Sequence, residues 1–196
     1  MTTDTQDKEF DPNNDPAKLA RIGTSQPVEP VTSIAPLAQG FRFDSFGRAP
    51  ARFDMEELAA LNARVVHQLP FDAVATRLPE GLDAAAWQAI RPNLKSVAEA
   101  ADWWAIVRGP VSAQAAEDDA AFLTEAAEAA AAIDWADAPW AALTARLKAS
   151  SGRGGKALFL PLRRALTGRD SGPEMAALLP LIGRGEAVAR LRAAAG

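Results

Sequence analysis

The side chains of this sequence that are best suited to chemistry are arginines and lysines near its C-terminal end. From Arg146 to the last residue there are ten Lys and Arg against three acids, Asp170, Glu174 and Glu186. This stretch carries a formal charge of +7, which leaves −11 on the remainder because the whole chain carries −4. Guanidinium and ammonium groups bind phosphates, and such asymmetry within one chain indicates an end that binds a polyanion.

Other kinds of site lack the residues that they need. The chain has no Cys and one His, His67, which excludes thiolate nucleophiles, disulfides and His-rich zinc sites. The segment SGRGGKA looks like a phosphate-binding loop, but that pattern requires Gly at position 150 and Ser or Thr at position 157. The chain has Ser150 and Ala157 instead. We therefore expect neither a catalytic nor a metal site.

Composition and hydrophobic spacing predict an all-α protein. Apolar residues make up 48% of the chain and Tyr is absent, which favours helices over strands. Apolar residues recur at helical spacing between Gly and Pro breaks, and no alternating strand pattern stands out. The expected helices are 54 to about 69, 83 to about 91, 96–107, 117–133, 137 to about 149, 156–167, 173–182 and 186–195.

Capping residues and apolar stripes give these helices their ends and faces. Asp54, Asp83 and Asp137 are expected to cap the helices that follow them, Gly168 to end helix 156–167, and Pro173 to open the next. The first helix has an apolar stripe of Leu58, Leu61, Val65 and Leu69. The expected core of the last helices consists of Phe159, Leu162, Leu166, Leu178, Leu179, Ile182, Val188 and Leu191.

We expect four regions along the chain. Residues 1–16 form a polar, disordered tail, 17–53 an irregular linker, 54–149 a first helical subdomain and 150–196 a second. The first residues are acidic and polar, where a signal peptide would be basic and then apolar. No run approaches the ~18 apolar residues that span a bilayer. The expected location is the cytoplasm, in soluble form.

One segment near the C-terminus carries a long and specific pattern. Residues 155–175 read GKALFLPLRRALTGRDSGPEM. This resembles the anticodon-binding end of glutamyl-tRNA synthetases, which are class I enzymes, where G-K-x-L-F-x-P-L-R-x-A-L-T-G precedes G-P-E and a leucine-rich helix. The resemblance continues in LLPLIGRGEAVARLRAA at the end, in FGRAPARFD at 46–54 and in LARIGTS at 19–25, so it covers about residues 17–196.

The resemblance implies an anticodon-binding helical bundle preceded by an irregular linker, with a role in tRNA recognition for glutamyl-tRNA formation. In this family a Rossmann-type catalytic domain precedes the matched region and carries HIGH-type and KMSKS-type signatures for ATP. Neither string occurs here. We therefore expect no aminoacylation by this chain alone and no cofactor, because ATP and Mg²⁺ belong to the catalytic domain. The expected partners are the anticodon loop of glutamate tRNA and a synthetase catalytic domain, with no membrane and no metal.

The resemblance also supplies candidate tRNA contacts. Arg163 lies one helical step from Phe159, and its family position implies direct contact with an anticodon base, on which a planar guanidinium can stack or donate. Gly172 permits close approach of a backbone, although some relatives carry a polar residue there, and Pro173 and Met175 correspond to positions near anticodon bases. The set is completed by Arg164 and by three residues expected at phosphates, Arg153, Lys156 and Arg169.

Two other classes of function remain open. The chain could be a freestanding relative of a synthetase tail that docks a synthetase as an interaction or regulatory module, because residues 17–50 resemble the bridge between the two halves of the family. Deleting residues 17–50 would then abolish partner capture but leave anticodon binding largely intact. A cryptic enzyme would need a nucleophile, a base and oxyanion donors, which the sequence does not assemble. Absence of ATP–pyrophosphate exchange would exclude it.

Overall fold

The computed structural model describes residues 35–45, 55–112 and 116–196, and these residues form helices and loops without a strand. Their α-helices are α2 (Ala35–Gln39), α3 (Met55–Val66), α4 (Ala84–Ile90), α5 (Ala100–Arg108), α6 (Ala120–Ala132), α7 (Pro139–Ser151), α8 (Lys156–Thr167), α9 (Met175–Ile182) and α10 (Arg184–Ala195). Short 3₁₀ turns are η2 (Phe43–Ser45), η3 (Phe71–Ala73), η4 (Ala75–Arg77), η5 (Arg91–Asn93), η6 (Val97–Glu99) and η7 (Glu117–Asp119). The predicted all-α class is confirmed.

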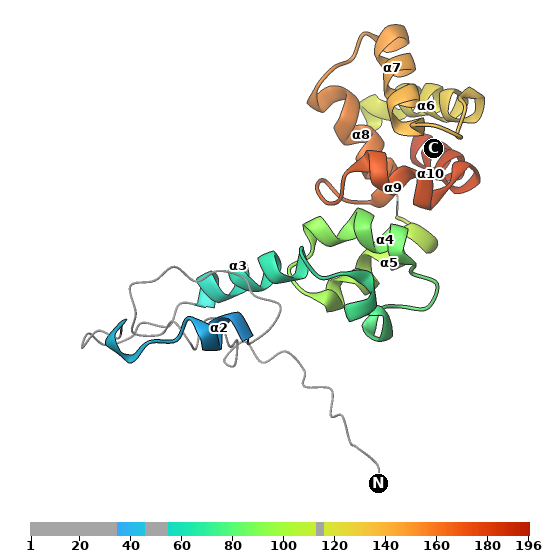
Figure 1. The fold of residues 1–196 in the computed structure, drawn as a ribbon. Helices are drawn as coiled ribbons and strands as arrows, with labels where there is room; N and C mark the ends of the chain where they lie inside the picture. Colours follow the sequence, from blue (N-terminus) through green and yellow to red (C-terminus); the bar gives the residue numbers. More distant parts are fainter. Residues whose placement is uncertain (1–34, 46–54, 113–115) are drawn as a thin grey trace.

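The helices are arranged as two groups that meet at α9 (Figure 1). Helices α4 and α5 form one group, and α3 extends from it toward α2. Helices α6 to α10 form the other group, in which α10 packs chiefly along α6. One continuous set of buried side chains runs through both groups, from Val66 to Leu191. The two groups therefore share a core.

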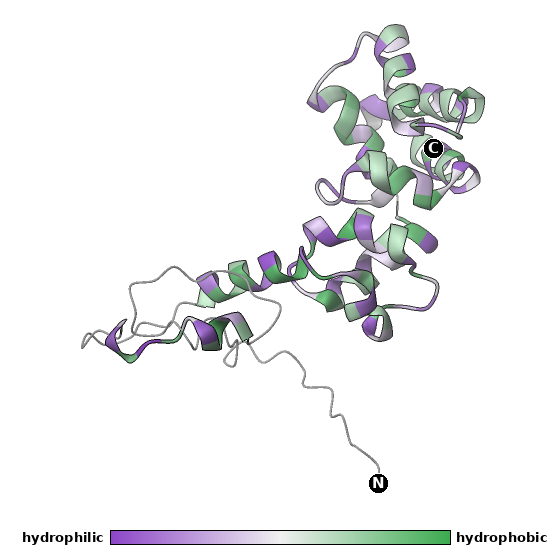
Figure 2. Cartoon of the chain, in the orientation of Figure 1, coloured by the Kyte–Doolittle hydropathy of each residue, from purple (hydrophilic) through white to green (hydrophobic). Residues whose placement is uncertain are grey.

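Helix α9 lies at the junction because its sequence has no polar face. Its residues, MAALLPLI, contain no charged or hydrogen-bonding side chain, and Figure 2 shows it coloured as hydrophobic. A helix that is apolar on all sides must be covered by neighbours. Helices α4 and α5 cover it from one group and α7 and α10 from the other. The loop that precedes α9 is thereby held against both groups.

Several predicted elements are confirmed residue by residue. Helix α8 spans Lys156–Thr167 as expected, and Gly168 ends it in the left-handed conformation, with φ of 67°. Asp83 caps α4, because its Oδ1 accepts a hydrogen bond from the backbone N–H of Ala86 at 2.8 Å. The side chains of Val97, Ala100, Trp104 and Val107, expected on one face of helix 96–107, are all buried.

Other expected boundaries are wrong, for local reasons. Helix α9 begins at Met175 and not at Pro173, because Glu174 has non-helical backbone angles and serves as its N-cap. Ala138, in the left-handed region with φ of 41°, takes the N-cap position of α7, where we expected Asp137 to cap. Residues 117–119 form a 3₁₀ turn, so α6 begins three residues late, and α10 begins at Arg184, two residues early.

Two expected core positions also differ. Val66 is buried on α3, whereas Val65, the residue expected there, is only partly buried. Phe159, expected in the core of the last helices, is 45% exposed. The buried face of α8 is formed by Leu158, Pro161, Leu162, Ala165 and Leu166, which recur at helical spacing and leave Phe159 on the neighbouring face. This exposure matters for the site described below.

Only part of the expected division into regions falls on residues that the structure describes. The tail 1–16, most of the linker 17–53 and the proposed cap Asp54 lie outside the described residues. The boundary expected between residues 149 and 150 falls within α7. Among the described residues, no helix is both long and apolar enough to cross a membrane, and no cluster of His, Cys, Asp or Glu could hold a metal ion.

Candidate nucleic-acid interface

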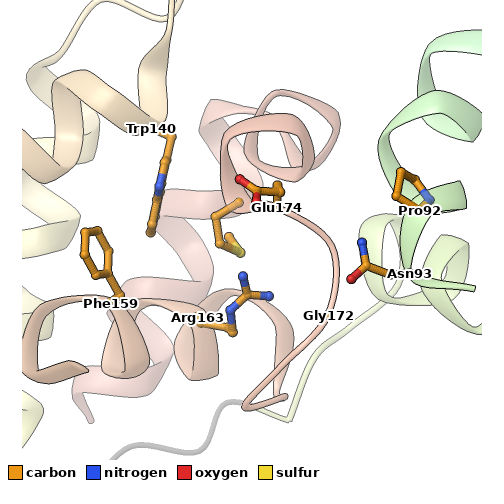
Figure 3. Close-up of a pocket in the computed structure, with 8 residues that line it drawn as sticks. Pro92, Asn93, Trp140, Phe159, Arg163, Gly172 and Glu174 are labelled. Carbon is orange, nitrogen blue, oxygen red and sulfur yellow. The ribbon is translucent and has the colours of Figure 1, made fainter. Parts of the chain in front are cut away.

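A pocket of about 480 Å³ opens where the two helix groups meet. Helices α7, α8 and α9 with the loop before α9 form most of its wall, and η5 forms the rest. The lining residues are Pro92, Asn93, Trp140, Phe159, Arg163, Gly172, Glu174 and Met175. In Figure 3, Trp140, Phe159 and Arg163 lie on one side of the loop that carries Gly172, and Pro92 and Asn93 lie on the other. Three of the predicted tRNA contacts, Arg163, Gly172 and Met175, thus meet in one pocket.

Arg163 is held in this pocket by the loop before α9. Its Nη1 donates a hydrogen bond of 3.0 Å to the backbone carbonyl of Pro173. Partial burial lowers the pKa of the Arg163 guanidinium, and the negative charge of Glu174 opposes that shift. The group stays charged, and its other donors make no hydrogen bond within the described part of the chain. Arg163 is therefore oriented but keeps donors for a ligand.

An aromatic surface lies beside this guanidinium. The rings of Trp140 and Phe159 are 6.1 Å apart between centroids and tilted by 38°. Phe159 and Arg163 are four residues apart on α8, so their side chains lie on the same face of that helix. Unpaired bases stack on aromatic rings and on guanidinium planes and present their edges to donors beside them. The pocket offers both features to one base.

Trp103 on α5 fixes the path of the loop before α9. A Cβ atom built on Gly172 would lie 2.1 Å from the Cη2 atom of the Trp103 ring, and Gly172 has φ of +147°. The close approach that we expected at Gly172 therefore occurs, but against the protein's own indole ring. The guanidinium of Arg169 lies over the same ring, 5.7 Å from its centroid. Trp103 thus positions the loop that lines the pocket.

The remaining predicted contacts lie outside the pocket. Lys156 is exposed at the start of α8, and Arg169 is exposed on the loop. Arg153 donates to Asp119 Oδ1 at 2.5 Å and lies 4.3 Å over the centroid of the Phe122 ring, so it joins the turn before α8 to α6. Pro173 is buried and contributes its carbonyl to Arg163. The roles of these residues in tRNA binding stay predictions.

Arg164, on α8, forms a two-point ion pair with Asp170 of the loop before α9. Its Nε donates to Asp170 Oδ1 at 2.6 Å and its Nη2 to Oδ2 at 2.8 Å. This hydrogen bonding lowers the pKa of the Asp170 carboxyl below its ordinary value. Since the pKa is depressed in the folded state, the pair stabilises the fold above the ordinary Asp range, and this contribution is lost as the pH falls through the folded value.

This ion pair gives a measurable pH dependence. In an NMR titration we expect the side-chain carboxyl of Asp170 to have its midpoint below the ordinary Asp pKa of about 3.9. Arg164→Ala should return the midpoint to that ordinary range because it removes the hydrogen-bond donors. Arg192→Ala, which removes an exposed arginine on α10, is the matched control and should leave the midpoint unchanged. A normal Asp170 midpoint in the unmodified protein would contradict the ion pair.

Sequence reasoning missed several residues of the site. Phe159 was expected in the core, and no role in a site was expected for Asn93, Trp103, Trp140 or Glu174. A signal for Phe159 was present, since it follows Leu158 and falls outside the i, i+3, i+4, i+7 series of the buried face. Trp103 and Trp104 are adjacent on a helix, so both cannot face the same core. No local sequence pattern indicates that Asn93 belongs to the site, because it reaches the pocket only through the packing of the two helix groups.

The chain is similar to known proteins over most of its length. The family model described as anticodon binding domain matches residues 63–195. The chain is 67% identical over 179 residues to glutamate–tRNA ligase 1 of Rhizorhabdus wittichii, covering 91% of this chain and 40% of that protein. It is 56% identical over 191 residues to glutamate–tRNA ligase 1 of Novosphingobium aromaticivorans, covering 97% and 43%. The chain thus spans about two fifths of the length of these relatives.

A solved structure has the same fold. The crystal structure of a glutamate tRNA ligase from Elizabethkingia meningosepticum, in complex with its amino acid, superimposes with a TM-score of 0.71 at 19% identity. The similarity covers 91% of this chain and 40% of that one. The fold and the match over residues 63–195 lead to the same assignment: this chain belongs to the anticodon-binding domain family, and the relatives it resembles are glutamate–tRNA ligases.

Proposed function

We propose that this chain is the part of a glutamate–tRNA ligase that reads the anticodon loop of glutamate tRNA. The steps that use ATP and Mg²⁺ belong, in this proposal, to the remainder of the ligase, since the chain spans about 40% of its relatives. The anticodon loop presents unstacked bases whose edges side chains can reach, in contrast to the deep, narrow major groove of an RNA helix. The protein recognises the loop, and the rest of the ligase acts on the far end of the tRNA.

One observation carries this proposal. The guanidinium of Arg163, fixed through Pro173, lies in a pocket that also exposes the aromatic pair Trp140 and Phe159. A solvated surface arginine would have neither the fixed orientation nor the stacking surface. Arg163 is suited to donate to a base edge while Phe159 supports the ring of a base. Lys156 and Arg169, both exposed near this region, are suited to the flanking phosphates.

Binding to tRNA at several salt concentrations tests the proposal. We expect the purified chain to bind glutamate tRNA more tightly than a copy with a changed anticodon. If about four phosphates are neutralised, the slope of log K against log salt should be about −3, at roughly −0.7 to −0.9 per phosphate. Binding with that slope but equal for both tRNAs would show a phosphate surface without anticodon reading, which would contradict the proposal.

Substitution of Arg163 tests the reading residue. Arg163→Ala should weaken binding of the native anticodon by about 1–3 kcal/mol and reduce discrimination at one anticodon position, because a base contact is lost. Arg169→Ala should weaken all RNAs alike and make the salt slope less steep by about one phosphate. Arg146→Ala, an exposed arginine on α7, is the matched control for lost charge. Equal losses for native and changed anticodons in Arg163→Ala would remove the specific role that we give this residue.

A further inference from the structure

The pocket contains a carboxylate as well as a guanidinium, and the two opposite charges limit which ligands it can bind. Glu174, the N-cap residue of α9, lines the pocket together with Arg163. Figure 3 shows the guanidinium of Arg163 directed toward the side on which Glu174 lies. The Glu174 side chain is exposed and makes no hydrogen bond or ion pair among the described residues. Both of its carboxylate oxygens are therefore available as acceptors to a ligand.

The two charges favour a base over a phosphate in this pocket. A phosphate bound by Arg163 would meet the carboxylate of Glu174, and like charges repel most strongly where water is partly excluded. The exposed Arg169, whose guanidinium lies over the Trp103 ring, does not line this pocket and is not subject to this restriction. A neutral ligand that presents hydrogen-bond acceptors and a donor side by side suits Arg163 and Glu174 together.

We propose that Glu174 determines specificity within this pocket by accepting a hydrogen bond from the exocyclic amino group of the base that Arg163 contacts. The proposal deepens the anticodon-reading function proposed above and rests on it. Cytosine fits the pair of side chains, since its N3 and O2 atoms accept from a guanidinium and its N4 amino group donates to a carboxylate. Uracil carries a carbonyl oxygen at the position of that amino group, so Glu174 would face an acceptor and reject it.

Glutamine at position 174 removes this selectivity without removing the side chain. The Gln amide can donate to the O4 atom of uracil or accept from the N4 atom of cytosine, so both bases are tolerated. Glu174 is exposed, and its change to Gln keeps its size, so we expect Glu174→Gln to fold, as urea unfolding will verify. Glu128→Gln is the matched control, because it removes the same charge from an exposed position on α6 that does not line the pocket.

The experiment measures dissociation constants for three pairs of glutamate tRNA transcripts. Each pair differs only by C or U at one anticodon position. We expect the unmodified chain and Glu128→Gln to prefer C about tenfold or more at one position, and Glu174→Gln to bind both members of that pair within about threefold. Retained preference in Glu174→Gln, or an affinity gain that is equal for all six RNAs, would overturn this inference and leave the proposed function standing. Equal binding of every transcript by the unmodified chain would overturn both.

Discussion

Replacing Arg190 with alanine should lower the free energy of unfolding by about 3–5 kcal/mol, the largest loss of stability that we expect from any single arginine. Arg190 is 4% exposed and lies on α10. Its Nη1 donates to the carbonyl of Leu166 at 2.7 Å, and its Nη2 to those of Val107 at 3.2 Å and Gly109 at 2.9 Å. One side chain thus joins the C-terminal ends of α5 and α8.

The size of the expected loss follows from the carbonyls that would be left behind. Alanine leaves three carbonyl groups, at the ends of two helices, without the donor that now satisfies them. Each buried and unpaired acceptor costs about 1–3 kcal/mol, and the empty space left by the guanidinium adds to the loss. The Nε bond to Glu186, at 2.8 Å, contributes less because that carboxylate is half exposed.

Urea unfolding followed by circular dichroism measures this effect directly. The matched control is Arg192→Ala, which removes an exposed arginine from the same helix and should change stability by no more than about 0.5 kcal/mol. Arg190→Lys should recover little, because an ammonium cannot reach the ends of two helices and Glu186 at once. A loss below about 1 kcal/mol in Arg190→Ala would mean that the carbonyls find other partners, and Arg190 would not be the link between the two groups.

Replacing Gly172 with alanine should cost about 2–4 kcal/mol of stability and also weaken tRNA binding. Two effects add at this position. The new methyl group would overlap the Trp103 ring, whose nearest atom is 2.1 Å from the Cβ position, and the φ of +147° is unfavourable for any residue with a side chain. Movement of the ring or the loop would shift Glu174 and the Pro173 carbonyl that orients Arg163.

A second glycine separates these two effects. Gly152 also has a positive φ, of 67°, but a Cβ atom there meets nothing within 4 Å. Gly152→Ala should therefore cost only about 1 kcal/mol, from backbone strain alone, and should not affect tRNA binding. In the double variant Trp103→Leu/Gly172→Ala the two losses should be less than additive, because the steric part is shared. Additive losses would show that Gly172 and Trp103 act independently.

Charge counting from the sequence overestimated the surface that is free to bind RNA. The ten basic residues from Arg146 onward include Arg190, which is buried, and Arg153 and Arg164, which are paired with acids. A polyanion would therefore meet fewer free cations than the net charge of this stretch suggests. The exposed residues Lys156 and Arg169 are better candidates for phosphate contacts than Arg153.

The sequence by itself determined the helical class, the bounds of α8 and the family, because these depend on local signals. Periodic apolar residues define the buried face of a helix, Gly168 ends α8 where φ must be positive, and a run of 21 residues is specific enough to identify relatives. The position of Arg163 on the same face of α8 as Phe159 also follows from spacing, since the two residues are one helical step apart.

Only the tertiary structure decided what surrounds Arg163 and which arginines are internal. Trp103 and Gly172 are 69 positions apart in the chain, and Arg190 is 83 positions from Val107, so no local pattern could pair them. The hydrogen bond from Arg163 to the Pro173 carbonyl depended on the path of the loop before α9, which lies against Trp103 of the other helix group. These features arise from packing between the two helix groups, where long-range contacts override the local preferences that a sequence displays.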